Sequence, residues 1–375
     1  MNTKKITNME VKKKNRNEVF RYICKHETVS NPDISYNMKI SLPTATQITK
    51  ELIAEGLLEE KGELQSTGGR RAKALSAVVN AKLAVGLDIT KNHITLLLTN
   101  IVGEILKYER VCQPYVSGET YYQKVNERLE LFLDESNIDR KKVLGVGISF
   151  PGIIDLDKEL ITYSHILGVE ALPFDSVRSF FSYPCFFLND ANAGAYAEGF
   201  YGDEAEQFFY LSLSNTVGGA IFSRNELIQG KNFRCGEVGH MTVVMDGENC
   251  YCGKMGCLDA YCAAWRLSEA ADGKLEQFFG LLDQGDLEAA KIWDSYTDYL
   301  AIAVNNIHMV LDCDIVLGGY VGSCIGMHLQ ELWDKVARRN TFGEKEPYVK
   351  VCNYKVAAAA LGAALKVIET FVSQI

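Results

Sequence analysis

The sequence predicts an α/β protein in which an N-terminal winged helix-turn-helix precedes a body of two α/β lobes. One observation is the charge: residues 1–80 contain 14 lysines and arginines against 9 aspartates and glutamates, and the rest contains 25 against 39. A second is the pattern of elements, in which three short helical segments precede two similar series of strands and helices. The third is a group of polar residues and glycines directly after strand ends, where a cleft between lobes is expected.

The N-terminal domain is expected over residues 16–80, behind a basic tail. The first 15 residues are rich in lysine and polar side chains, and we expect them to be disordered. Apolar residues at helical spacing predict short helices over residues 17–25 and 32–38. Ser41 fits an N-cap and opens a third helix that runs to about Glu55.

A two-stranded wing is expected after the third helix, over residues 57–64, with a turn-like Lys61-Gly62, and 67–71. In a winged helix-turn-helix the third helix enters the major groove of double-stranded DNA. A small protein-interaction or dimerisation domain would use the same helices, so the basic charge and the wing are what favour operator DNA. The side chains expected to contact DNA are Thr44, Thr46, Gln47, Thr49 and Lys50 on the helix, and Arg70 and Arg71 at the wing.

The first lobe is expected over residues 81–190. It begins with an antiparallel meander of three strands, and an amphipathic helix and two further strands follow. The strands are expected at residues 83–90, 93–101, 104–111, 143–149 and 184–188, and the helix at 119–137.

The second lobe is expected over residues 191–375 and nearly repeats this order. An alanine-rich segment, residues 357–364, predicts a closely packed C-terminal helix, which we expect to return to the first lobe. Two such lobes would enclose a cleft. Strands are expected at residues 208–213, 219–223, 226–229 and 314–317, and a helix at 299–311.

One imidazole and three thiols lie close together between Gly236 and Cys262. His240, Cys250, Cys252 and Cys257 form a complete tetrahedral set of zinc ligands. Cys250 and Cys252 are too near in sequence to bridge each other without strain, which weighs against incidental buried cysteines. Since four protein ligands leave no position open for water, the sequence predicts a structural zinc ion.

The remaining composition predicts a cytoplasmic protein. No apolar run reaches the roughly 18 residues needed to cross a bilayer. The basic N-terminus is not followed by an apolar core, so it does not fit a signal peptide. Eleven cysteines without an export signal indicate reduced thiols and a metal site, and no membrane partner is expected.

Six short motifs occur along the chain: FPGIID at 150–155, LNDANAGA at 188–195, GEVGH at 236–240, CYCGKMGC at 250–257, IVLGG at 315–319 and STGGRRAK at 66–73. Together they resemble the motifs of the ROK family of repressors, open reading frames and sugar kinases, and specifically of its transcriptional repressors. The resemblance implies an actin-like, sugar-kinase-like fold of the ribonuclease H type, zinc on the four ligands, a sugar effector and a homodimer or homotetramer. It also implies a sugar site of Gly152, Asn189, Asp190, Glu237, His240 and Asp259, with one ring nitrogen of His240 on zinc and the other toward a sugar hydroxyl.

The sequence departs from the kinases of this family in its phosphate loops. Residues 88–92 and 214–218 carry side chains where the kinases have glycines, so the backbone is not expected to wrap phosphate closely. Asp259 is one methylene shorter than the glutamate usual there, and residues 231–235 replace a smaller segment. We therefore favour a sugar-responsive repressor that is not an enzyme.

The alternative is an ATP-dependent hexose or N-acetylhexosamine kinase with an appended DNA-binding domain. In the kinases of the family the equivalent of Asp190 is the general base, so that residue would be catalytic. Asp190 also fits a helix N-cap, and it can serve in either role.

Overall fold

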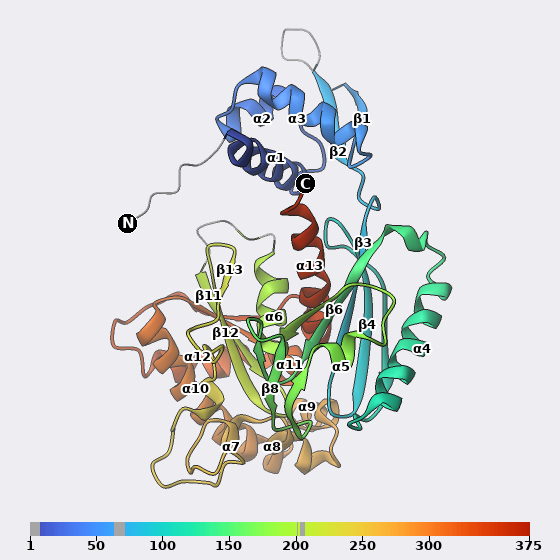
Figure 1. The fold of residues 1–375 in the computed structure, drawn as a ribbon. Helices are drawn as coiled ribbons and strands as arrows, with labels where there is room; N and C mark the ends of the chain where they lie inside the picture. The colour runs from blue at the N-terminus through green and yellow to red at the C-terminus, as the bar shows by residue number, and fades with distance from the viewer. Residues whose placement is uncertain (1–7, 64–71, 201, 203–206) are drawn as a thin grey trace.

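The computed structural model describes residues 8–63, 72–200, 202 and 207–375. A small N-terminal domain stands above a body of two α/β lobes, and the C-terminal helix rises between the lobes toward that domain (Figure 1). Within the described part of the chain, no helix is both long enough and apolar enough to cross a bilayer.

The N-terminal domain consists of α1 (Asn8–Cys24), α2 (Asn31–Met38), α3 (Leu42–Ala54) and an antiparallel pair of strands, β1 (Leu58–Glu63) and β2 (Lys73–Ala77). The predicted N-cap is confirmed, because the hydroxyl of Ser41 accepts a hydrogen bond from the backbone N–H of Thr44. The second and third predicted helices are likewise confirmed. The largest fully buried side chains of this domain are Phe20, Ile23, Ile34, Ile48, Leu52 and Leu75.

The prediction of a disordered tail over the first 15 residues is wrong from Asn8 onward, since that segment is the first half of α1. Lys12 pairs with Glu51 of α3 at 2.9 Å, and Arg16 pairs with both Glu51 and Glu55. Two of the basic side chains of α1, Lys12 and Arg16, therefore pair with acidic residues at the end of α3. Nothing in the composition of the tail itself indicates this contact.

The wing also differs from its prediction. Lys61 and Gly62 do not form a turn, because β1 continues through both of them with an irregularity in register. The partner strand is β2, which pairs Leu58 with Ala77 and Glu60 with Leu75. The predicted wing segment 67–71 lies outside the described residues.

The first lobe contains β3 (Leu83–Ile89), β4 (His93–Asn100), β5 (Ile105–Cys112), α4 (Glu119–Glu135), β6 (Val143–Phe150) and β10 (Cys185–Asn189). The five strands form one sheet in the order β10-β6-β3-β4-β5. β3, β4 and β5 are an antiparallel meander, and β6 and β10 are parallel to β3. The predicted elements of this lobe are confirmed.

A second sheet of the first lobe was not predicted. It is antiparallel and consists of β7 (Ile153–Asp155), β8 (Leu160–Ser164) and β9 (Val169–Pro173), and the single-turn helix α5 (Asp175–Arg178) follows. These strands have three to five residues, which is too short for their alternation to be recognised.

The second lobe repeats the first. Its sheet has the order β13-β12-β11-β14-β15, again a meander of three antiparallel strands followed by two parallel ones. The predicted bilobal fold is confirmed. The bounds are β11 (Gln207–Leu213), β12 (Val217–Ser223), β13 (Glu226–Ile228), α9 (Leu275–Asp283), α10 (Leu287–Leu311), β14 (Asp314–Gly318), α11 (Gly319–Cys324), α12 (Leu329–Ala337) and β15 (Val349–Val351).

Two elements of the second lobe extend beyond the prediction. α10 begins at Leu287, well before the predicted start at Tyr299, because the carboxylate of Asp286 caps it by accepting hydrogen bonds from two backbone N–H groups. β15, of three residues, was not predicted.

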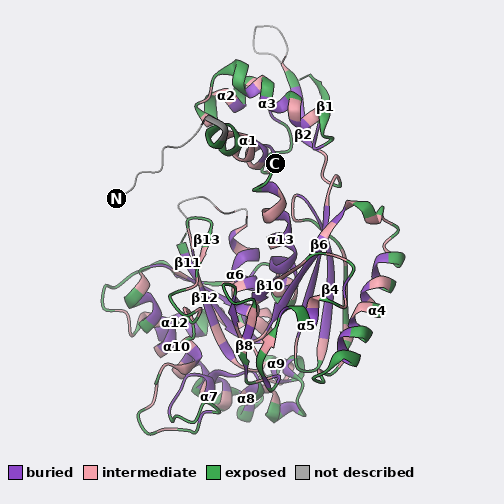
Figure 2. Cartoon of the chain, viewed as in Figure 1, coloured by how far each residue is buried: buried purple, intermediate pink, exposed green. Residues whose placement is uncertain are grey.

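The C-terminal helix α13 (Ala358–Val372) packs on the first sheet and on α6 (Asp190–Gly199). A Cβ atom at Gly86 of β3 would lie 1.8 Å from the carbonyl oxygen of Ala360, and one at Gly147 of β6 would lie 1.9 Å from that of Ala363. Small residues on both sides are therefore required for this approach. Figure 2 shows α13 and the strands of both sheets largely buried.

Candidate functional site

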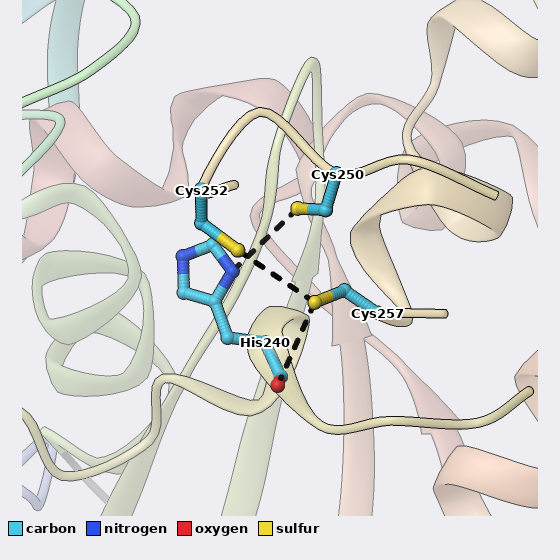
Figure 3. A group of neighbouring side chains, drawn as sticks. All are labelled: His240, Cys250, Cys252 and Cys257. Carbon is cyan, nitrogen blue, oxygen red and sulfur yellow. Dashed lines mark hydrogen bonds between the residues drawn. The ribbon is translucent and has the colours of Figure 1, made fainter. Parts of the chain in front are cut away.

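The four predicted metal ligands converge on one point in the second lobe (Figure 3). Their ligand atoms all lie within 4.8 Å of one another. Sγ of Cys250 is 3.8 Å from Nδ1 of His240, and Sγ of Cys252 is 3.7 Å from Sγ of Cys257. A tetrahedral ion with Zn–S bonds of about 2.3 Å separates its sulfur ligands by about 3.7 Å. The donor set and its spacing therefore fit zinc.

The local backbone explains how three thiols reach one point. Gly253 and Gly256 both have positive φ angles, of 84° and 77°, which permit tight turns between the cysteines. A Cβ atom at Gly256 would lie 1.7 Å from the carbonyl oxygen of Val244. All four ligands belong to one loop and the 3-10 turn Val238–His240 before it, so an ion here would hold this part of the second lobe in one conformation.

The second ring nitrogen of His240 faces away from the cluster. Nε2 lies 3.4 Å from the hydroxyl of Tyr251, and the ring of Tyr251 stacks on His165 of the first lobe with 4.1 Å between ring centroids. Burial lowers the pKa of His240, which favours the neutral ring that a metal ligand requires. The sequence reasoning missed Tyr251 and His165; the position of Tyr251 between two ligand cysteines was the available signal.

Asn189 sits at the start of α6 and organises the polar groups there. Its side-chain oxygen accepts a hydrogen bond from the backbone N–H of Asn192, and its amide donates to the carbonyl of Gly152 and to Asp190, each at 3.0 Å. The N-cap of α6 is therefore Asn189, not Asp190. The carboxylate of Asp190 is thus not committed to capping.

Three carboxyl groups gather near this point from different elements. Burial raises the pKa of Asp190. Burial also raises the pKa of Glu237, and the negative charge of the neighbouring Asp190 adds to this shift. Asp259, the first residue of the short helix α7 (Asp259–Cys262), is buried and accepts a hydrogen bond from the backbone N–H of Val217 at 2.7 Å. Burial raises the pKa of Asp259 to about 6.

A cavity of about 900 Å³ begins at Asn189 and Glu237. Gly152, Asn189 and Glu237 line one end, and residues of α1 and α2, among them Arg21 and Met38, line the other. Ligand pockets span roughly 300–1,000 Å³, so this cavity has room for a small ligand and more. Among the predicted sugar-site residues, Asp190, His240 and Asp259 do not line the cavity. Asp190 lines a smaller cavity, and the shorter side chain of Asp259 reaches β12 instead.

A second and much smaller cavity, of about 70 Å³, lies between the first strand turns of the two lobes. Asp88, Asp190 and Tyr320 are among its lining residues. The guanidinium of Arg110 lies 5.3 Å from the centre of the Tyr320 ring, so that ring is held in place. At 70 Å³ this space is far smaller than a nucleotide site of ordinary size, roughly 300 Å³ or more.

Asp88 gives this region a pH dependence. Burial raises the pKa of Asp88 to about 7, above the ~3.9 of an unfolded aspartate, so stability falls as pH rises through that interval. Asp88→Asn removes this titrating group. The free energy of unfolding of the variant minus that of the wild type is therefore expected to increase by roughly 2–4 kcal/mol from about pH 4 to pH 8. Thermal and urea denaturation at several pH values measure this, with the exposed Asp246→Asn as control. A pH-independent difference would contradict the prediction.

The predicted DNA-contacting face is only partly exposed. Thr44, Gln47 and Lys50 are exposed and Thr46 is half-buried, but Thr49 is 2% exposed and its hydroxyl donates to the side chain of Asn31 at 2.9 Å. Assigning Thr49 to the exposed face was therefore wrong. It lies on the same stripe as the core residues of α3 at helical spacing. The predicted wing contacts Arg70 and Arg71 lie outside the described residues.

A model of the ROK family matches residues 84–370. The chain belongs to the ROK family. A putative xylose repressor from Caldicellulosiruptor sp. (strain Rt8B.4) is 30% identical to this ROK protein over 386 residues, with 96% of each chain covered. The transcriptional dual regulator NagC of Escherichia coli (strain K12) is 27% identical over 279 residues, which cover 73% of this chain and 67% of NagC.

A solved structure shows the shared fold. The crystal structure of a ROK family transcriptional regulator, a homolog of the E. coli MLC protein, has a TM-score of 0.77 to this ROK protein at 18% identity. The match covers 97% of this chain and 100% of that one, so it includes the N-terminal domain as well as both lobes. The predicted fold class, an N-terminal domain of three helices and two wing strands ahead of a bilobal α/β body, is confirmed.

Proposed function

We propose that this protein is a sugar-responsive transcriptional repressor. It binds operator DNA through α3 and the wing, and it binds a sugar effector at the end of the large cavity formed by Gly152, Asn189 and Glu237. The observation that carries the proposal is the course of that cavity, which connects these hydrogen-bonding groups to α1 and α2 of the N-terminal domain. The similarity over 96% of a putative xylose repressor supports the same function.

The chemistry of the cavity end suits a sugar. Hydroxyl groups need acceptors that are fixed in place and donors that can return a hydrogen bond. At the cavity end Glu237 supplies a carboxylate and Asn189 supplies an amide, anchored in the loop before the metal cluster and at the start of α6. Asp190, the next residue after Asn189, lines the smaller cavity. We assign His240 an indirect role, in which it fixes Glu237 on one side and Tyr251 on the other.

The sugar would act on DNA binding through α6 and α13. α6 begins at the sugar groups, and a Cβ atom at Gly362 of α13 would lie 1.7 Å from the carbonyl of Ala193 in α6, so the two helices are in close contact. Glu369, near the end of α13, pairs through both carboxylate oxygens with Arg21 of α1. A ligand that prefers one arrangement of the lobes would shift the N-terminal domain along this path.

The assembly follows from the mode of DNA recognition. Helix-turn-helix proteins read two half-sites about one helical turn apart, so we propose a homodimer or a homotetramer. A repressor acts where the chromosome is, which places this protein in the cytoplasm. We propose that zinc at the cysteine cluster is structural, because the four ligands of the cluster leave no position for a reacting water.

The test combines binding of sugars and of DNA. A panel of pentoses, hexoses and N-acetylated amino sugars is screened by thermal shift, since a ligand that binds only the folded state raises its stability by about 2.7 kcal/mol at 100 times its Kd. Fluorescence anisotropy with its own promoter DNA is then measured with and without the sugar that binds. Absence of a salt-sensitive preference for that DNA over random DNA, under both conditions, would reject the proposal.

The second candidate function is a sugar kinase, which the carboxylate of Asp190 favours as a general base, because it is not the N-cap of α6 and it lines the small cavity. The small cavity argues against it, because Tyr320 and the side chains after β11 occupy the region where phosphates would bind. We therefore expect no ADP release in a coupled assay over the same sugars. Steady turnover that Asp190→Asn abolishes would establish the kinase instead.

A further inference from the structure

A second group of metal-ligand side chains lies at the C-terminal end of α10, on elements separate from the cysteine cluster. It consists of His308, Asp312 and Glu344, whose ligand atoms lie within 4.8 Å of one another. His308 is on the last turn of α10 and Asp312 is its C-cap residue four positions later, so both side chains are on one side of the helix end. Glu344 approaches from the loop after α12.

The hydrogen bonds of His308 determine where its protons are. Its side chain is only 6% exposed, and Nδ1 lies 2.9 Å from the carbonyl oxygen of Cys313. Because a carbonyl only accepts, Nδ1 carries the hydrogen. In the neutral ring Nε2 therefore presents a lone pair, and that lone pair faces a carboxylate oxygen of Glu344 at 3.1 Å. A positive charge is needed between two such acceptors.

The surroundings reinforce the need for a cation. Two carboxylates gather at the negative end of a 25-residue helix dipole. In the described part of the chain, no lysine or arginine forms an ion pair with Asp312 or Glu344. Neighbouring residues also fix the orientation of two of these side chains. The ring of His308 stacks on Tyr348 with 3.6 Å between ring centroids, and Glu344 accepts a hydrogen bond from the side chain of Asn340 at 2.8 Å. A histidine fixed by a backbone carbonyl is the usual arrangement of a metal ligand.

We propose that His308, Asp312 and Glu344 bind a divalent transition-metal ion through one imidazole nitrogen and two carboxylates, with water completing the coordination. One nitrogen and oxygen donors favour Zn²⁺, Co²⁺ or Mn²⁺ over Ca²⁺, and the absence of sulfur distinguishes this site from the cysteine cluster. The ion would tie the loop after α12 to the end of α10.

The test is a titration with Co²⁺, followed by calorimetry and visible absorption, of the full-length protein purified in the presence of Zn²⁺ and then dialysed until one Zn²⁺ per chain remains. We expect one Co²⁺ per chain without a thiolate charge-transfer band, and an affinity at least about tenfold lower in His308→Gln and in Glu344→Gln. Glu346→Gln, on an exposed residue of the same loop, is the matched control and should titrate like the wild type.

Three results would overturn the proposal. The first is that Co²⁺ does not bind, or that it binds only with a thiolate charge-transfer band. The second is that Glu344→Gln binds Co²⁺ with the same affinity as the wild type. The third is an NMR titration in which the ring of His308 gains a proton as pH falls while its signals do not change on adding Co²⁺, since a proton would then supply the charge. Because Glu344 and Glu346 are exposed, both variants should fold.

Discussion

Cys252→Ser is expected to remove the bound zinc and to weaken sugar binding together, by about 10- to 100-fold for the sugar. Cys252 is exposed, so the change removes a metal ligand with little loss of packing. Without the ion, backbone hydrogen bonds such as that from Cys250 to the carbonyl of Lys254 hold the loop, and His240 and Tyr251 lose their common anchor. Metal content by mass spectrometry and sugar affinity by calorimetry are measured on the same samples.

The reason for the joint loss is the position of His240 between two sites. One ring nitrogen faces the thiols, and Glu237, three residues earlier, faces the cavity. The 3-10 turn Val238–His240 connects them rigidly, since the backbone N–H of His240 donates to the carbonyl of Glu237. A loose histidine therefore displaces the carboxylate that would accept a sugar hydroxyl.

The control is Cys112→Ser, at an exposed cysteine at the end of β5 that does not belong to the cluster. It should retain both metal and sugar. If Cys252→Ser loses its metal but keeps the wild-type sugar affinity, the proposed connection between the two sites is wrong, although the zinc assignment would stand. If it keeps its metal, the zinc assignment itself is wrong.

The parts of the structure that follow local rules could be predicted from the sequence. Ser41 marks the start of α3 by capping chemistry, and the strands of both meanders have enough residues for their apolar pattern to appear. The four metal ligands could be predicted because they lie within one short segment and form a complete donor set. Local signals of this kind need no knowledge of the tertiary structure.

The rest depended on contacts between distant segments. The prediction of a disordered tail failed because Glu51 and Glu55, at the end of another helix, pair with Lys12 and Arg16 of α1. The stacking of Tyr251 on His165 joins the two lobes, and neither residue alone suggests it. Thr49 lies on the buried face of α3, contrary to the prediction, because its hydroxyl finds a hydrogen-bond partner on another helix, Asn31 of α2.

Glu369→Gln is expected to leave sugar binding unchanged and to abolish the effect of the sugar on DNA binding. Coupling between two sites typically changes affinity by about 5- to 150-fold, and we expect this factor to fall to about 1 in the variant. The measurement is operator affinity by fluorescence anisotropy with and without saturating sugar. Sugar affinity is determined separately by calorimetry.

The physical reason is that Arg21 and Glu369 are the charged contact between α1 and α13. The pairing with Glu369 outweighs the effect of burial and raises the pKa of Arg21, so the guanidinium stays charged. Lys25, one turn later, donates to the carbonyl of Gly202 at 2.9 Å, but that contact does not involve α13. Loss of the pair therefore frees the N-terminal domain from the helix that contacts the sugar site through α6.

Two further variants separate this coupling from a general loss of stability. The exchanged pair Arg21→Glu with Glu369→Arg restores the opposite charges and should recover part of the sugar response, whereas Arg21→Glu alone should not. Glu288→Gln breaks an exposed ion pair with Lys291 on α10 and should leave the response intact. A full sugar response in Glu369→Gln would mean that the signal passes by another route. The large cavity extends to Arg21 and Met38, so a ligand that contacts the N-terminal domain directly through this cavity would be the alternative.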